Sequence, residues 1–194
     1  MKLLLENWRQ YLNEEKLRVF DFDDTLVKSD SRIKATHMTG TKKYLTPAEF
    51  AQEGEHPDYE YDYSEFETVI DPREIKKVTK ILKNMVNAGT DGREIVILTA
   101  RAPESEGAIK NYLEDIGVDI SKITFVLLGN ADPKAKSSWI ENKIINGADD
   151  ILFLDDSGKN VEAVKELQDK YPEIKFDVRK VSYAEEIQEE GIIK

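Results

Sequence analysis

The sequence contains no cysteine and only two histidines, His37 and His56, among its 194 residues. The missing cysteines exclude a disulfide scaffold, a thiol nucleophile and a thiolate metal site. Two histidines leave little for a histidine-rich zinc site or for a conventional Ser-His pair. Apolar runs of the roughly 18 residues that span a bilayer are also missing. We therefore expect a cytoplasmic protein without membrane contact.

Positively charged residues are fewer than negatively charged ones: the sequence has 28 Lys and Arg and 39 Asp and Glu, which give a net charge of −11. That surplus of negative charge argues against a sequence-independent grip on duplex nucleic acid. Apolar residues at 40% and charged residues at 35% are typical of a soluble globular protein. The length fits a single domain over residues 1–194, with room for a small insertion. Carboxylates are therefore the most available reagents for any chemistry.

Short apolar runs alternate with amphipathic helical patterns along the chain. Apolar residues at nearly every position of a run are typical of strands buried on both faces of a parallel sheet. Five strands are expected, at 17–22, 94–99, 123–128, 150–154 and 174–178. Helices are expected at 72–87, 104–116, 134–145 and 159–170, the first of them opened by Asp71 as a cap and Pro72 in its first turn. The sequence predicts a three-layer, doubly wound, Rossmann-like α/β fold with a mainly parallel five-stranded sheet.

Two segments interrupt this alternation. A helix expected at 3–13 carries an apolar stripe that either packs on the core or docks onto a partner. Residues 28–70 are too long for an ordinary connection after the first strand. They are either a solvated, partly ordered insertion or a cap over a site. In the second case Tyr59, Tyr61 and Tyr63 would stack on a base, while the acids between them would repel a polyanion.

Polar groups follow three of the expected strands. They are Asp21-Phe22-Asp23-Asp24-Thr25, Thr99-Ala100-Arg101 and Asp155-Asp156-Ser157, and Lys134 and Lys136 open the helix between the last two. Ligands of open α/β sheets bind beyond the carboxyl ends of the strands. Clustered carboxylates raise one another's pKa values unless a cation neutralises them, and oxygen ligands suit magnesium. A lysine, a hydroxyl and an arginine at the same edge suit phosphate. The pattern favours phosphoryl transfer.

With these motifs in this order, the sequence resembles the haloacid dehalogenase-like (HAD) phosphohydrolase superfamily. The resemblance covers the DxDxT motif at 21–25, the hydroxyl of Thr99, a lysine, and the acidic pair Asp155-Asp156. It implies a phosphatase or phosphotransferase, because dehalogenases of this superfamily lack the acid found here as Asp23. The sequence is more loosely similar to small nucleotide and polynucleotide-end phosphatases of phages and repair enzymes.

The resemblance also implies roles for individual residues. Asp21 would be the nucleophile and a Mg²⁺ ligand. Asp23 would be the general acid and base and would bind the metal through its backbone carbonyl. Asp156 would reach the metal, with Asp155 supporting it. Thr99 would hydrogen-bond the phosphoryl group.

The lysine of the motif is either Lys134 or Lys136. Lys136 fits better, because Trp139 and Ile140 follow it by three and four residues on the apolar face of the helix. Ala100 and Arg101 are expected to contact the phosphate or the leaving group. Asp24 and Thr25 are expected to be structural, and Ser157 and Asn160 to be either helix caps or ligands.

We therefore expect a Mg²⁺-dependent phosphomonoesterase that forms an aspartyl-phosphate. Its substrate would be a small phosphate ester, a nucleotide or a nucleic-acid 3′ end. The alternative is a catalytically weak phosphate-binding or docking module of the same fold. A receiver domain of the response-regulator kind also uses acids, a hydroxyl and a lysine, but the DxDxT spacing and the long insertion do not match it.

Overall fold

A computed structural model describes residues 15–90 and 92–182 of the chain. Its centre is a five-stranded sheet in the order β10-β9-β1-β7-β8, in which every neighbouring pair is parallel. The strands are β1 (Glu15–Phe20), β7 (Arg93–Thr99), β8 (Thr124–Leu127), β9 (Ala148–Asp155) and β10 (Lys175–Lys180). The five strands expected from the apolar runs are therefore confirmed, and their ends lie within a few residues of the expected positions.

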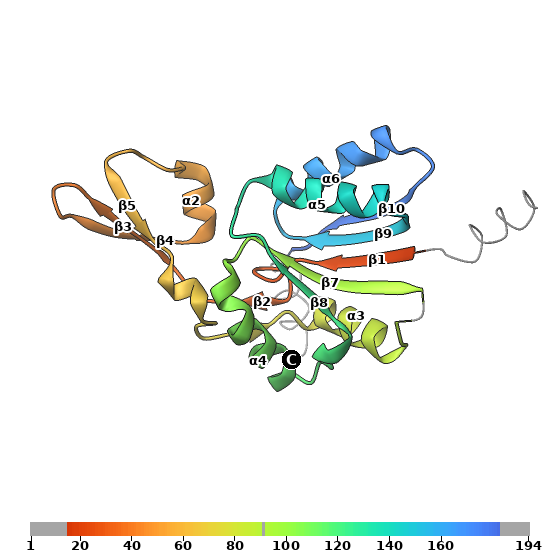
Figure 1. The fold of residues 1–194 in the computed structure, drawn as a ribbon. Helices are drawn as coiled ribbons and strands as arrows, with labels where there is room; N and C mark the ends of the chain where they lie inside the picture. Colours follow the sequence, from red (N-terminus) through yellow and green to blue (C-terminus); the bar gives the residue numbers. More distant parts are fainter. Residues whose placement is uncertain (1–14, 91, 183–194) are drawn as a thin grey trace, which may run out of the picture.

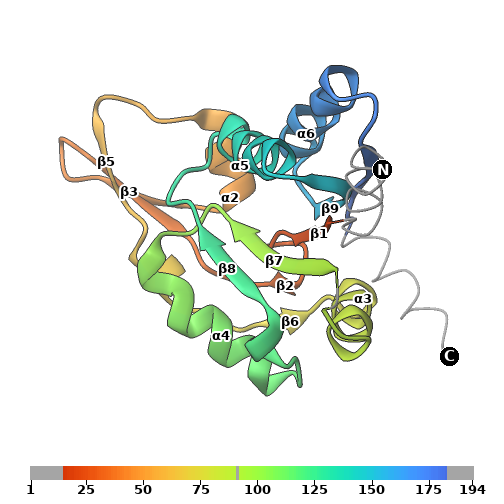
Figure 2. The same cartoon turned by 45° about the vertical axis from the view of Figure 1, so that its right-hand side comes forward.

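Helices cover both faces of this sheet (Figures 1 and 2). One face packs on α3 (Lys76–Asn87) and α4 (Glu106–Asp115), through a core that includes Phe20, Leu82, Ile97 and Leu113. The other face packs on α5 (Pro133–Ile145) and α6 (Gly158–Lys170), through Val19, Ile140, Phe153 and Val164. Neighbouring residues of one strand, such as Val19 and Phe20, face opposite cores, as the period of two in a strand requires. The three-layer, doubly wound α/β fold is confirmed.

The order of the strands reverses between β1 and β9. From β1 the chain proceeds to β7 and β8 on one side, and it then returns to β9 on the other side of β1. Phe20 is in register with Leu154, and the Asp21 amide donates to the Leu154 carbonyl over 2.9 Å. The residues that follow these two strands therefore lie side by side where the strand order reverses, which is the usual ligand site of such sheets.

The segment after the first strand is a folded insertion. It contains a three-stranded antiparallel sheet in the order β4-β3-β5 and one short helix, and it extends from the carboxyl edge of the central sheet (Figure 1). The elements are β3 (Ile33–His37), β4 (Lys42–Leu45), α2 (Pro47–Glu53), β5 (Tyr59–Asp62) and the 3₁₀ turn η1 (Ser64–Glu67). The reciprocal hydrogen bonds of Thr46 and Glu49 open α2 as a capping box.

The two ends of the insertion are joined by a short antiparallel pair, β2 (Val27–Lys28) with β6 (Arg73–Glu74). This pairing corrects the expected start of the following helix. Asp71 does not cap it, because residues 73–74 are held extended against β2 and the Ile75 amide donates to the Leu26 carbonyl. Helix α3 begins only at Lys76 and has no side-chain cap, and Asp71 itself has a φ of +44°.

The remaining connections contain the 3₁₀ turns η2 (Pro103–Ser105) and η3 (Ile120–Lys122). Within residues 15–90 and 92–182, no helix has the length and apolar character to cross a membrane. The helix expected at 3–13 lies outside the described residues.

Candidate active site

A tight turn after β1 carries the DxDxT residues. The amides of Leu26 and Val27 both donate to the Phe22 carbonyl, and the Asp24 amide donates to the Val27 carbonyl. Asp24 has a φ of +55°, a left-handed conformation that aspartate tolerates better than most residues. The Asp24 side chain pairs with Lys28 over 2.6 Å. Asp24 therefore has a structural part in the turn, while the acids on either side of the buried Phe22 are left for other contacts.

A buried ion cluster lies at the carboxyl ends of β1 and β9. The Lys136 ammonium, from the first turns of α5, donates to Asp21 Oδ1 over 2.6 Å and to Asp155 Oδ2 over 2.7 Å. Asp21, Lys136 and Asp155 are 5%, 3% and 0% exposed. Lys134, two residues earlier, is exposed. The structure thus brings Lys136, and not Lys134, to the acids of the two central strands.

The cluster contains more negative charge than one lysine can neutralise. Burial raises the pKa of Asp21 well above its usual value, Lys136 opposes this shift, and Asp155 and Asp156 add to it. Burial, followed by the charges of Asp155 and Asp24, raises the pKa of Asp156 to about 7. Burial alone would lower the pKa of Lys136, but the two acids that it contacts raise it. The lysine therefore stays charged, whereas Asp21 and Asp156 do not ionise easily without another cation.

The donors of this cluster fit a magnesium ion. One carboxylate oxygen each from Asp21, Asp155 and Asp156 lies within 4.8 Å of the other two. Hard oxygen donors with surplus negative charge are the set that Mg²⁺ prefers. Asp155 has less freedom to bind an ion than Asp21, because Lys136 donates to one oxygen of each but the Asn160 side chain also donates to both oxygens of Asp155.

Three further residues hold the cluster in place. The side-chain amide of Asn160 donates to both oxygens of Asp155, each over 3.0 Å, and the backbone amide of Ser157 donates to Asp155 Oδ1 over 2.8 Å. Ser157 also caps α6. The fully buried Thr25 hydroxyl lies 3.4 Å from Asp21 Oδ2 and accepts a hydrogen bond from the Asp156 amide. Thr25 was expected to be structural, and its contacts agree with this. Its link between Asp21 and Asp156 depends on strand register, which one sequence does not display.

The end of β7 completes the edge. Thr99 is 1% exposed, and its hydroxyl accepts from the Arg101 amide over 3.2 Å; the half-buried Ala100 lies between them. The contact of Arg101 with phosphate stays a prediction. In the structure the Arg101 guanidinium donates to Asp23 through two hydrogen bonds of 2.8 and 2.7 Å. Asp23 also lies 3.5 Å from the Ser29 hydroxyl.

The insertion approaches this edge without placing its tyrosines on it. Tyr59 and Tyr61 pack in the insertion's own core, and Phe50 meets Tyr61 and Tyr63 with ring centroids 5.3 and 5.9 Å apart. A small cavity of about 70 Å³ lies between the loop at Asp23 and the start of α2 at Pro47. The insertion is therefore a neighbour of the DxDxT turn. Base stacking by these tyrosines stays a prediction, and their first contacts are with one another. Both histidines belong to the insertion.

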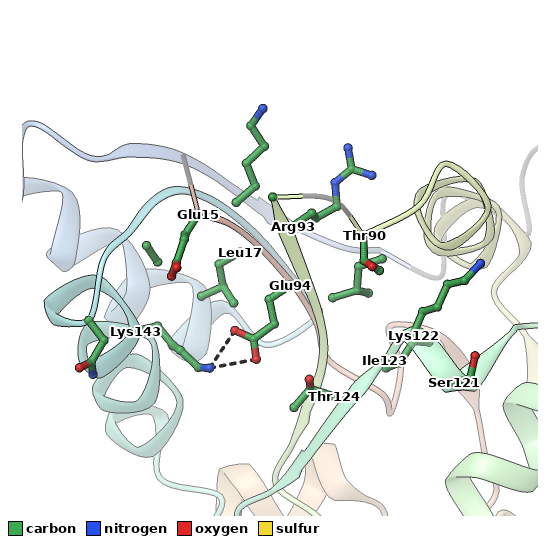
Figure 3. A pocket seen from close by; sticks show the side chains of 15 residues that line it. Glu15, Leu17, Thr90, Arg93, Glu94, Ser121, Lys122, Ile123, Thr124 and Lys143 are labelled. Atoms are coloured by element: carbon green, nitrogen blue, oxygen red, sulfur yellow. Dashed lines mark hydrogen bonds and ion pairs between the residues drawn. The ribbon is translucent and has the colours of Figure 1, made fainter. Parts of the chain in front are cut away.

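A larger cavity, of about 610 Å³, lies at the opposite edge of the sheet. Figure 3 shows its lining residues, which include Leu17, Glu94 and Thr124 at the amino ends of neighbouring strands and Lys143 of α5. Glu94 pairs there with Lys143 over 2.8 Å, and both side chains are about one-third exposed (37% and 33%). This cavity has no buried cluster of acids among the described residues.

Comparison with known proteins gives one family match. A family model with the description "Protein of unknown function (DUF2608)" matches residues 5–134, about two-thirds of the chain. The matched range includes Asp21, Asp23, Thr99 and Arg101 and ends before Lys136, Asp155 and Asp156. No curated protein and no solved structure matches the chain.

Proposed function

Because the chain belongs to the DUF2608 family of proteins of unknown function, we propose its function from the site itself: a magnesium-dependent phosphomonoesterase. One observation carries the proposal, namely the buried contact of Lys136 with Asp21 and Asp155 at the strand-order reversal. The burial of charges lowers the free energy of unfolding unless they are well paired. A cluster of buried charges at the ends of two strands therefore favours a functional role over a structural one. Acids, an ammonium and a hydroxyl together match the needs of phosphoryl transfer.

The proposed reaction has two steps with Asp21 as the nucleophile. In the first, an Asp21 carboxylate oxygen attacks phosphorus and the bond from phosphorus to the leaving oxygen breaks, while Asp23 gives that oxygen a proton. In the second, a water oxygen attacks phosphorus and passes a proton to Asp23. The bond from phosphorus to Asp21 then breaks and releases inorganic phosphate. Both aspartates end as they began, and one difficult displacement becomes two easier ones.

The other residues would orient and neutralise the transferring group. Lys136 would hold one oxygen of Asp21, leaving the other for attack, and would balance charge as it moves to the phosphoryl oxygens. Thr99, at the end of β7, would donate its hydroxyl hydrogen to the phosphoryl group. Asp21, Asp156 and the Asp23 carbonyl would hold Mg²⁺, which when bound supplies positive charge for the phosphoryl oxygens.

The substrate class that suits this site is a small phosphate monoester, such as a nucleotide or a single nucleic-acid terminus. A net charge of −11 disfavours a long polyanion, whereas one terminal phosphate needs only the local positive charge of Lys136 and the metal.

The test is hydrolysis of a panel of phosphate esters by the full chain. The panel holds an aryl phosphate, alkyl phosphates, mononucleotides and 3′-phosphorylated oligonucleotides. We expect turnover with Mg²⁺ and none after exhaustive chelation. Ca²⁺ should inhibit, because its longer bonds and larger coordination number misplace the carboxylates. Binding of inorganic phosphate without any turnover would favour the phosphate-binding module, and full activity in chelator would refute the metal requirement.

A further inference from the structure

Among the residues that the structure describes, Arg101 is a buried cation outside the Lys136 cluster, and nearly all of its N–H groups donate hydrogen bonds. Its side chain is 2% exposed. Nε and Nη2 donate to the two oxygens of Asp23 over 2.8 and 2.7 Å, and Nη1 donates to the carbonyls of Phe66 and Thr68, each over 2.6 Å. These bonds use four of the five N–H groups of an arginine. Little of the guanidinium is left for a substrate phosphate.

Two aromatic rings hold the same guanidinium. The centroids of Phe22, from the DxDxT turn, and Phe66, from η1 of the insertion, each lie 5.3 Å from Arg101 Cζ. Arg101 itself follows β7. From its place after β7, this one side chain therefore contacts two segments that are distant in sequence, the turn after β1 and the return of the insertion. Stacked and forked contacts of this kind need arginine, because lysine offers neither a planar group nor a fork.

We infer that Arg101 is a positioning residue that acts through Asp23 and that couples the insertion to the proton-transfer step. Asp23 is 24% exposed on its side chain, so packing alone does not fix its carboxylate, and the fork of Arg101 does. The fork is fixed in turn by Phe66 and by the two insertion carbonyls. The insertion thereby contributes to chemistry and not only to the choice of substrate. This inference rests on the proposed function, since it assigns a role within that reaction.

The first test replaces Arg101 with methionine, which is unbranched and apolar and keeps much of the volume between the two rings. Because a displaced Asp23 transfers protons poorly, kcat should fall by about 10- to 100-fold, with KM unchanged within about twofold. The loss should be larger for an alkyl phosphate than for a nitrophenyl phosphate, since a poor leaving group depends more on an acid. Binding of inorganic phosphate in Mg²⁺, measured by calorimetry, should stay the same.

The second test compares two phenylalanines of the insertion. Phe66 contacts Arg101, whereas Phe50 packs in the same small core against Tyr61 and Tyr63. Phe66→Ala should reproduce the kcat loss and leaving-group pattern of Arg101→Met, and Phe50→Ala should not. In an Asp23→Asn background, Arg101→Met should reduce the remaining rate of nitrophenyl phosphate hydrolysis less than twofold, because the group through which it acts is already gone.

The outcomes separate this inference from the function on which it rests. A wild-type chain that hydrolyses no phosphate ester refutes the proposed function. In an active wild type, a tenfold or greater loss of phosphate affinity in Arg101→Met would show that Arg101 is a substrate ligand and would overturn the inference. Unchanged kcat in that variant, or full additivity with Asp23→Asn, would overturn it as well.

Discussion

The two edges of the central sheet are built from the same strands and differ in chemistry. At the amino edge, the cavity of about 610 Å³ contains an ion pair, Glu94 with Lys143, whose side chains are 37% and 33% exposed. At the carboxyl edge, Lys136 and Asp155 are 4% and 0% exposed on their side chains and bind over 2.7 Å. Water can therefore solvate the charges of the ion pair at the amino edge. Water cannot solvate the buried charges at the carboxyl edge in the same way.

Because of this difference, we base the proposed site on buried charge and not on cavity volume. An ion pair whose side chains are about one-third exposed is screened by solvent and contributes only about 0–1 kcal/mol to the stability of the fold. Charges removed from water carry a desolvation penalty of several kcal/mol each, which their mutual attraction rarely exceeds by much. We therefore expect substitutions at the two edges to differ in kind, with effects on catalysis confined to the carboxyl edge.

The largest expected effect is that of Asp21→Asn. Removal of the nucleophile should lower turnover by about 10⁴-fold or more, while the fold survives because one charge leaves a crowded acidic site. Steady-state hydrolysis of an aryl phosphate in Mg²⁺, with circular dichroism as the control for folding, measures both. Substantial residual turnover by the folded variant would show that another group attacks.

Lys136→Met should cost both stability and activity. It leaves Asp21 and Asp155 buried without their cation, and breaking a buried pair in this way costs about 3–5 kcal/mol. Lys134→Met is the matched control, since an exposed lysine of the same helix should change stability by about 0.5 kcal/mol or less. Urea unfolding of the two variants gives the comparison. Equal losses would mean that the contacts of Lys136 add nothing.

The pH dependence of stability without metal should have an unusual sign. Because the pKa of Asp156 is about 7 in the folded state and that of an aspartate in the unfolded chain is about 4, the folded state binds the extra proton between these values. Stability in chelator should therefore fall as pH rises from 5 to 8. Mg²⁺ should oppose the fall, since its ligands must be deprotonated. Thermal unfolding of wild type and Asp156→Asn measures this. A steeper fall of stability with pH in Asp156→Asn than in the wild type would contradict the raised pKa of Asp156.

The smallest expected effect is at the amino edge. Lys143→Met removes the ion pair with Glu94 and should change stability by about 1 kcal/mol or less. Its turnover should match that of the wild type. A tenfold loss of turnover in this variant would show that the amino edge takes part in the reaction and would remove the contrast between the two edges.

The sequence predicted those features of the fold and of the candidate site that depend on residues close together in the chain. Runs of apolar residues fixed the strands, and the spacing of Lys136 before Trp139 and Ile140 favoured the lysine that reaches Asp21. Asp71-Pro72 misled, because the pairing of β2 with β6, whose residues lie some 46 positions apart, overrides a local cap signal. No sequence pattern predicted the hydrogen bonds of Arg101 to the Phe66 and Thr68 carbonyls, because every residue has a backbone carbonyl that can accept such a bond.

The most direct measurement is acid-quench trapping of the reaction in Mg²⁺, followed by mass spectrometry of the peptide that contains Asp21. The account predicts a phosphoryl group on Asp21 in the wild type during turnover and none in Asp21→Asn. Quenched Asp23→Asn, in which the second step lacks its base, should accumulate more of the adduct than the wild type. Turnover without a phosphorylated peptide, together with an active Asp21→Asn variant, would contradict the claim that the carboxyl edge carries a nucleophilic aspartate.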